Sequence, residues 1–354
     1  MANLIDSVRS DKLLSRYAPG IVYVLSGGSS KGFCHLGMIE ALEKRGIRPD
    51  FVVGTSAGAL FGSLYCHFGS VQGVRLRVRE VLASSEFADF SRKYLGEKND
   101  KNGDSAKWRQ FVSTVSGKVM KGLMIGQTLA TQSMIHGRDV SAIFAEIFRG
   151  IDFESLKIPF AAVATDLLNA IPAIFSSTQG PNPPGKPFRP SLAKAVMAST
   201  AIPFLFPAVD IGGIDCADGY MMANLPVREA RALAGGRVYV AAFDVSSPLA
   251  RKDDEFSSFE LALRLLDLAA GSKQAADREL ADICYRPVDR DYPWSSFGEY
   301  ESFIELGSHY MGGERIDAFL SGWREACARA IAAEGNPLRR FLAARRLSQM
   351  RAAP

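Results

Sequence analysis

Two apolar runs that end in small residues constrain the fold of this 354-residue chain most strongly. "IVYVLSGG" (21–28) and "DFVVGTS" (50–56) lack polar alternation, which is typical of parallel strands covered on both faces. The segment between them, "SKGFCHLGMIEALEKRG", has apolar residues near helical spacing and stops at Gly46. The pattern predicts a strand–helix–strand unit whose parallel strands end at one edge of a sheet.

The second run continues into a serine between two glycines. Gly54-Thr55-Ser56-Ala57-Gly58 matches G-x-S-x-G, in which a sharp strand-to-helix turn lifts the serine hydroxyl clear of the sheet. A helix, "AGALFGSLYCHF", is predicted directly after it. We interpret Ser56 as a candidate nucleophile; the alternative is a structural turn that needs small residues.

The first run ends in a glycine loop, residues 26–32, which also follows a strand and opens a helix. Backbone N–H groups at such a helix start can bind an anion. The loop lacks the usual G-x-G-x-x-G pattern, and no acidic residue closes the next strand, which argues against a dinucleotide site. If Ser56 attacks a carbonyl, the N–H groups of Gly28 and Ser29 are well placed to stabilise the oxyanion.

A serine nucleophile needs a base. The chain has four histidines: His35, His67, His136 and His309. His67 lies roughly 16 Å from Ser56 along the same helix and cannot reach it, and only His309 comes late enough for the Ser…Asp…His order. The other option is an aspartate, Asp218 in "CADGYMMANLPV", where the following Gly219 lets the chain turn.

Charge and cysteine content exclude several classes of function. The net charge is only +4 and its basic residues are scattered, so we expect no nucleic-acid partner. The five cysteines are odd in number and form no CxxC pair, which argues against a disulfide framework and a zinc site. The charged N-terminal segment and the lack of a membrane-spanning apolar run favour a cytoplasmic location.

Later segments complete an α/β pattern. We expect a hairpin from "IPFAAVATDL" and "AIPAIFSS", a second hairpin that turns at Gly212-Gly213, and a buried strand at 237–245. From about residue 255 the pattern turns helical, broken by "CYRPVDRDYPW". The sequence predicts one three-layer α/β domain with a mostly parallel central sheet and C-terminal helices.

Three segments in order, "LSGGSSKGFCHLGMIEALEKRGIRPDFVVGTSAGAL", "ASTAIPFLFPAV" and "ADGYMMANLPV", resemble the patatin-like phospholipase family. The resemblance covers roughly residues 20–315. It implies a patatin-like fold and a Ser-Asp dyad without histidine, with Ser56 as nucleophile and Asp218 as base, and no metal or organic cofactor. It also implies backbone oxyanion donors at Gly27, Gly28, Ser29 and Ser30, and supporting motif residues at Lys31, Gly32, Gly54, Gly58 and Gly219. For Lys31, an exposed lysine at the helix start is the alternative.

The family resemblance implies a serine acyl hydrolase that cleaves fatty-acyl esters of phospholipids or lysophospholipids, with transient contact with a membrane surface. Two residues depart from the family pattern. Ser29 replaces a glycine; it would keep the backbone N–H, but in a backbone conformation that is unfavourable for serine. Tyr220 replaces a small residue. These departures motivate a rival interpretation, a non-catalytic lipid-binding or regulatory module.

We expect three parts along the chain: an N-terminal segment (1–19), the hydrolase domain (20–315) and a C-terminal helical extension (316–354). Residues 92–140 are predicted to be a variable, partly helical insertion. Within it, residues 111–126 carry an apolar stripe that suits a lid, a lipid-facing surface or ordinary core packing. "NPLRRFLAARRLSQMR" is predicted to be a solvated helix rather than a membrane anchor. Oligomeric state is not predicted.

Overall fold

A computed structural model describes residues 4–95, 133, 135–178, 190–203, 205–248, 258–290, 292 and 299–350. Most of the insertion predicted at 92–140 lies outside these residues, and so does the whole apolar stripe at 111–126.

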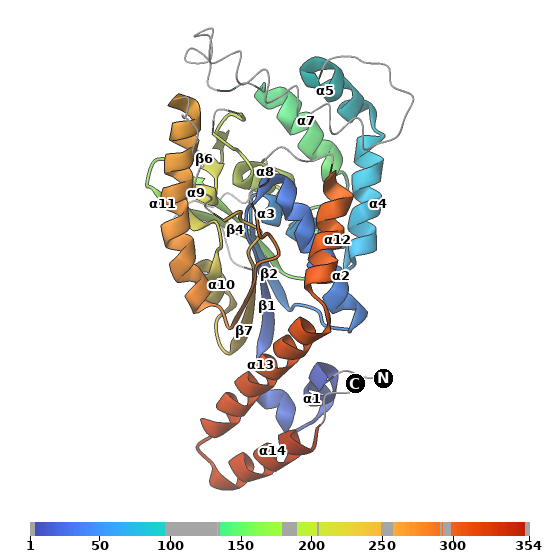
Figure 1. The fold of residues 1–354 in the computed structure, drawn as a ribbon, viewed down its shortest axis with the longest axis vertical. Helices are drawn as coiled ribbons and strands as arrows, with labels where there is room; N and C mark the ends of the chain where they lie inside the picture. Colours follow the sequence, from blue (N-terminus) through green and yellow to red (C-terminus); the bar gives the residue numbers. More distant parts are fainter. Residues whose placement is uncertain are drawn as a thin grey trace.

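The described residues form an eight-stranded sheet in the order β5-β6-β3-β2-β1-β7-β8, with β4 paired to β3 (Figure 1). The pairs among β1, β2, β3, β7 and β8 are parallel, whereas β4 and β6 are antiparallel to β3. The strand bounds are β1 Gly20–Leu25, β2 Phe51–Thr55, β3 Phe160–Asp166, β4 Ile171–Ser176, β5 Val209–Asp210, β6 Asp215–Asp218, β7 Val238–Phe243 and β8 Ile283–Tyr285.

Helices cover both faces of the sheet because successive side chains of a strand point to opposite sides. Along β1, Ile21 and Tyr23 pack into the core with α2, α3 and α12, whereas Val22 and Val24 pack toward α10. One face carries α2 (Phe33–Lys44), α3 (Ala57–Phe68), α4 (Val71–Leu82) and α12 (Tyr300–Tyr310); the other carries α9 (Tyr220–Ala223), α10 (Val227–Ala234) and α11 (Ser258–Leu280) (Figure 1). The predicted three-layer α/β fold is confirmed.

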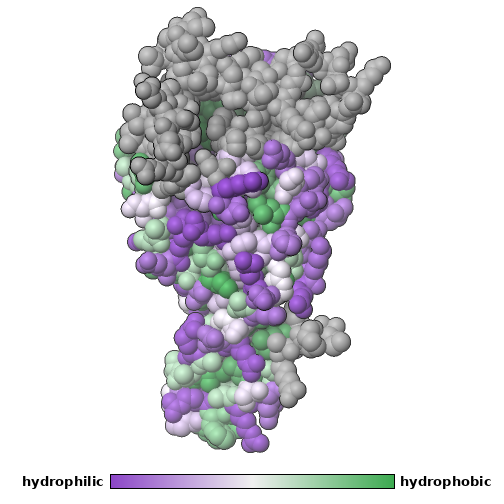
Figure 2. Space-filling view, viewed as in Figure 1, coloured by the Kyte–Doolittle hydropathy of each residue, from purple (hydrophilic) through white to green (hydrophobic). Residues whose placement is uncertain are grey.

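The upper end of the molecule in Figure 1 carries α5 (Ser85–Leu95) and α7 (Gly137–Ile147), and α8 (Leu192–Ser199) contacts α7 from below. The lower end is a bundle of α1 (Leu4–Ser10), the short helix η1 (Leu14–Arg16), α13 (Gly313–Ala332) and α14 (Pro337–Gln349). Apolar and hydrophilic surface alternate over this lower bundle (Figure 2). The segments predicted at 1–19 and 316–354 contact each other in this bundle, for example through the Arg346–Asp11 ion pair.

Helix α13 crosses the boundary that was predicted at 315/316. The division of the chain into three parts stays a prediction.

Both predicted hairpins are confirmed, as is the strand at 237–245. Gly212 and Gly213 both have positive φ, as a tight turn requires. The helical pattern expected after residue 255 is interrupted where the sequence predicted a break, at "CYRPVDRDYPW", but the short strand at this place, β8, was not predicted; it pairs in parallel with β7. With three residues, β8 is too short for its apolar pattern to stand out.

Candidate active site

Strand β3 brings the ends of two other strands together. β4 occupies one edge of β3 along Ala161–Asp166, so β2 and β6 must share the other edge. β2 runs beside Phe160–Val163, and β6 runs beside Ala164–Asp166 in the opposite direction. The carboxyl ends of β2 and β6 therefore meet head to head, which places Ser56 opposite Asp218.

Ser56 lies on a strained turn between β2 and α3. Its φ of 53° and ψ of −122° are unusual for a residue with a side chain and cost about 1–3 kcal/mol. Ser199 holds the turn, because its Oγ accepts the Ser56 N–H at 2.9 Å and donates to the Val163 carbonyl oxygen at 2.6 Å. The turn has the geometry expected of a nucleophile elbow.

The Ser56 hydroxyl donates to Asp218 Oδ2 at 2.7 Å, and both residues are buried, with exposed fractions of 6% and 3%. The Tyr220 N–H donates to Asp218 Oδ1 at 2.9 Å, and Thr165 Oγ1 donates to the Asp218 carbonyl oxygen at 2.8 Å. Burial raises the pKa of the Asp218 carboxyl to about 6, and the hydrogen bonds from Tyr220 and Ser56 only partly offset this. A carboxylate with such a pKa can accept a proton near neutral pH.

Neither Ser56 nor Asp218 hydrogen-bonds to a histidine among the described residues. As predicted, His67 does not reach Ser56; its Nδ1 lies 3.0 Å from Ser155 Oγ. His309 is exposed on α12 and makes no hydrogen bond with either member of the pair. His35 is buried beside the glycine loop, where its Nε2 bonds to the Ser26 carbonyl oxygen at 2.9 Å, and burial lowers its pKa to about 4.

The glycine loop lies beside the elbow. Its peptide groups are held by the Gly27 N–H, which donates to the Asn224 carbonyl oxygen at 3.1 Å, and by the Lys31 N–H, which donates to the Gly28 carbonyl oxygen at 3.1 Å. The Gly28 N–H has no hydrogen-bond partner within the described ranges. A Cβ at Gly28 would lie 2.6 Å from Val245 Cγ2, so only glycine fits there without movement.

The last residues of the loop form a short 3-10 helix, η2 (Ser29–Gly32), in which Ser30, Lys31 and Gly32 are buried. Ser29 has a φ of 52°, the disfavoured conformation expected at this position. Lys31 is only 7% exposed, so the alternative of an exposed lysine at the helix start is wrong.

A sequence model described as patatin-like phospholipase matches residues 23–231. The chain belongs to the patatin-like phospholipase family. It is 24% identical over 345 residues to lysophospholipase NTE1 of Debaryomyces hansenii, an alignment that covers 90% of this chain and 19% of that protein. It is 30% identical over 156 residues to neuropathy target esterase sws of Drosophila persimilis, covering 44% of this chain and 9% of that protein. The chain thus spans a fifth or less of the length of these two relatives.

Among solved structures, human GIVD cytosolic phospholipase A2 aligns with 92% of this chain and 63% of its own, at a TM-score of 0.45 and 14% identity.

A second set of buried polar residues lies beside the glycine loop of this family member and was not predicted from the sequence. Asn224 is 3% exposed, and its Nδ2 donates to Gln274 Oε1 at 3.2 Å. Gln274 in turn donates to the buried carboxylate of Asp244 at 2.7 Å. A Cβ built on Gly27 would lie 2.5 Å from Asn224 Oδ1 and 3.1 Å from Ser56 Cβ, so both side chains border the same small space. The one sequence signal was a polar residue, Asn224, in an otherwise apolar stretch.

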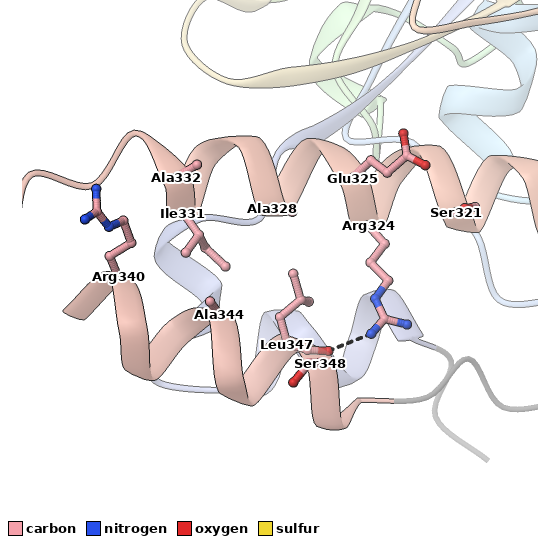
Figure 3. Close-up of a pocket in the computed structure, with 10 residues that line it drawn as sticks. All are labelled: Ser321, Arg324, Glu325, Ala328, Ile331, Ala332, Arg340, Ala344, Leu347 and Ser348. Carbon is pink, nitrogen blue, oxygen red and sulfur yellow. Dashed lines mark hydrogen bonds between the residues drawn. The ribbon is translucent and has the colours of Figure 1, made fainter. Parts of the chain in front are cut away.

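A groove of about 440 Å³ lies elsewhere, between α13 and α14 (Figure 3). Arg324 crosses it to donate to the Leu347 carbonyl oxygen at 2.9 Å. None of the residues that line the groove belongs to the elbow, the glycine loop or the Asp218 turn.

Two searches of the described residues bear on cofactors and membranes. They contain no group of three or more His, Cys, Asp or Glu residues that could hold a metal ion. They also contain no helix with the length and apolar character needed to cross a membrane.

The five cysteines are free thiols. Four of them are buried, and Cys284 is half-buried.

Proposed function

We propose that this chain hydrolyses fatty-acyl esters of phospholipids or lysophospholipids, with Ser56 as nucleophile and Asp218 as general base. The observation that carries the proposal is the 2.7 Å hydrogen bond between these two buried side chains at the meeting point of β2 and β6. The names of the NTE1 relatives, which are lysophospholipases, support the substrate class.

In the acylation step, Asp218 takes the hydroxyl proton of Ser56 while Ser56 Oγ attacks the ester carbonyl carbon. The carbonyl oxygen becomes negative and is stabilised by backbone N–H groups of the glycine loop. When the carbon–oxygen bond to the alcohol breaks, the proton passes from Asp218 to the departing alcohol oxygen. The products are a free alcohol and an acylated Ser56.

In the deacylation step, Asp218 takes a proton from a water molecule, whose oxygen attacks the acyl carbon. The bond to Ser56 Oγ then breaks, Ser56 recovers its proton from Asp218, and the fatty acid leaves. Every proton that is taken up is returned, so the dyad regains its starting state. The scheme uses no histidine.

The geometry supports a narrower oxyanion hole than the sequence predicted. The Gly27 N–H already donates to Asn224, so we assign Gly27 a packing role and keep Gly28 as the principal donor. Ser29 and Ser30 follow at the start of η2 and remain proposed donors.

The two departures from the family pattern are compatible with turnover. Ser29 retains its backbone N–H in the positive-φ conformation, and the backbone of Tyr220 supplies a hydrogen bond that holds Asp218. The rival interpretation, a non-catalytic lipid-binding module, predicts that a fluorophosphonate probe leaves Ser56 unlabelled. An active dyad predicts covalent labelling at Ser56.

The decisive variants are Ser56→Ala and Asp218→Asn, assayed for hydrolysis of a p-nitrophenyl acyl ester. We expect each to lower kcat at least about 10³-fold with the fold intact, because each removes one member of the proton-transfer pair. His309→Ala is the matched control and should retain full activity. Retained activity in Ser56→Ala would refute the proposal, and loss of activity in His309→Ala would favour a conventional triad.

A further inference from the structure

The turn between β3 and β4 presents an unusual apolar surface. Three of its large apolar side chains are exposed, Leu167 by 53%, Leu168 by 78% and Ile171 by 44%. We call residues 167–171 the hairpin tip; its sequence, Leu-Leu-Asn-Ala-Ile, contains no charged residue.

Four backbone N–H groups of the hairpin tip have hydrogen-bond acceptors within the protein. Asp166, which is fully buried, accepts the N–H groups of Leu168 and Asn169 at 2.9 Å each, and the Asn169 side chain at 2.8 Å. The Leu167 N–H donates to the Asp215 carbonyl oxygen at 2.9 Å, and the Ala170 N–H to the Asp166 carbonyl oxygen at 3.0 Å. These four N–H groups therefore need no hydrogen bond from water, and their transfer to an apolar phase carries no cost of an unpaired donor.

The hairpin tip stands on the edge of the sheet that carries the proposed active site. Val163 of β3 is level with Thr55, the last residue of β2 before Ser56. β3 continues for three more residues to Asp166, roughly 10 Å, so the tip extends beyond the level of Ser56 on the same side. An apolar phase into which this tip inserts would therefore lie next to the carboxyl edge of the sheet, where Ser56 and Asp218 meet.

Other exposed leucines have different surroundings. Leu76 lies between Arg75 and Arg77 on α4, and Leu338 is followed by Arg339 and Arg340 on α14. α14 is also at the far end of the molecule from the β2–β6 junction (Figure 1). The hairpin tip combines exposed leucines, a run without charge and proximity to the dyad.

We propose that the hairpin tip is a lipid-surface anchor, which inserts Leu167, Leu168 and Ile171 into the surface of a neutral, zwitterionic bilayer. The choice of a lipid surface rests on the proposed function, because the substrates of a phospholipid or lysophospholipid hydrolase lie in such a surface. The neighbouring hairpin carries two exposed acidic residues, Asp210 and Asp215, which disfavour an anionic surface.

The test is co-sedimentation with phosphatidylcholine vesicles, using protein that carries Ser56→Ala so that turnover plays no part. We expect Leu167→Ser with Leu168→Ser to weaken vesicle partition at least about tenfold, because two apolar side chains no longer enter the lipid. The matched control, Leu338→Ser with Leu342→Ser on α14, should bind like the parent protein. Leu168→Lys repeats the test at the most exposed position if the double variant misfolds.

Three results would overturn the anchor. They are no vesicle binding by the parent protein, unchanged binding by the hairpin variants, and loss of binding in the α14 control. A dimer that becomes a monomer in the hairpin variant would instead assign the tip to a contact between copies. In protein that keeps Ser56, the Leu167/Leu168 double variant and the Leu338/Leu342 control should both hydrolyse soluble p-nitrophenyl butyrate at the normal rate. If the unmodified enzyme does not hydrolyse this ester, the proposed function is wrong, and the vesicle binding of the Ser56→Ala protein still decides the anchor.

Discussion

Ser56 and Asp218 each occupy an environment that costs the folded protein free energy. Ser56 has a positive φ that side chains disfavour, and Asp218 is a carboxyl with 3% exposure and no ion pair among the described residues. Such local costs persist only where the surroundings hold them in place. Here Ser199 holds the serine turn and the Tyr220 N–H holds the carboxylate.

Replacement of Asp218 by asparagine should therefore stabilise the fold at neutral and alkaline pH. The folded-state pKa of about 6 lies above the ordinary value of 3.8, because burial favours the protonated carboxyl. Below about pH 4 Asp218 is protonated in both the folded and the unfolded chain, and the folded state has its full stability. As the pH rises through about 6, ionisation lowers the free energy of unfolding. At about pH 8 the variant should gain up to roughly 3 kcal/mol in free energy of unfolding. Urea unfolding at about pH 8 and about pH 4 measures this. Lower stability of the variant at the higher pH would contradict the assigned burial.

At the scale of elements, the glycines of the G-x-S-x-G motif allow a helix to pack closely on a strand. A Cβ on Gly58 would lie 2.2 Å from the Leu25 carbonyl oxygen, and one on Gly54 would lie 2.4 Å from the Gly58 carbonyl oxygen. Neither glycine has a positive φ. The motif predicted these glycines for the sharp turn. In the structure Gly58 also permits the close approach of α3 to β1, and Gly54 permits the close approach of α3 to β2.

Gly58→Ala should consequently separate α3 from β1 and lower the free energy of unfolding by about 1–3 kcal/mol or more. The matched control is Gly335→Ala, because a Cβ at Gly335 meets no atom within 4 Å. Thermal unfolding of the two variants beside the parent protein measures the difference. Equal melting temperatures for all three would mean that the backbone contact at Leu25 relaxes freely.

Sequence patterns predicted the elements whose signal is local. Continuous apolar runs gave the central parallel strands, and the Gly212-Gly213 pair gave a turn. The polar residues around the glycine loop were not predictable in this way, because Asn224 and Gln274 are separated by 50 positions. The pairing of Ser56 with Asp218, across 162 positions, was supplied by the family resemblance and not by periodicity.

At the scale of the whole molecule, the described residues separate two regions at opposite ends of the sheet (Figure 1). The elbow follows the carboxyl end of β2, whereas the lower bundle joins both ends of the chain. Trp323 Nε1 donates to the Pro19 carbonyl oxygen at 3.2 Å, and Tyr17 donates to Glu334 at 2.8 Å. These contacts cross more than 300 positions, so no local pattern could have indicated that residues 1–19 pack with 316–354.

This separation also distinguishes the groove in Figure 3 from the proposed active site. The groove lies in the lower bundle, and its lining comes entirely from α13 and α14. The dyad, the glycine loop and the hairpin tip all lie at the carboxyl edge of the parallel strands, where α/β sheets bind ligands. The proposed chemistry and the proposed lipid contact therefore share one edge of the sheet.

The most direct measurement of the central claim, that Asp218 activates Ser56 without histidine, is the pH dependence of kcat/KM for a soluble acyl ester. Because Asp218 must be ionised to take the proton, kcat/KM should fall tenfold per pH unit below an apparent pKa of about 6. The same limb should persist in His67→Ala, His136→Ala and His309→Ala. Its disappearance in any of these histidine variants, or a flat profile across about pH 6 in the parent enzyme, would contradict the claim.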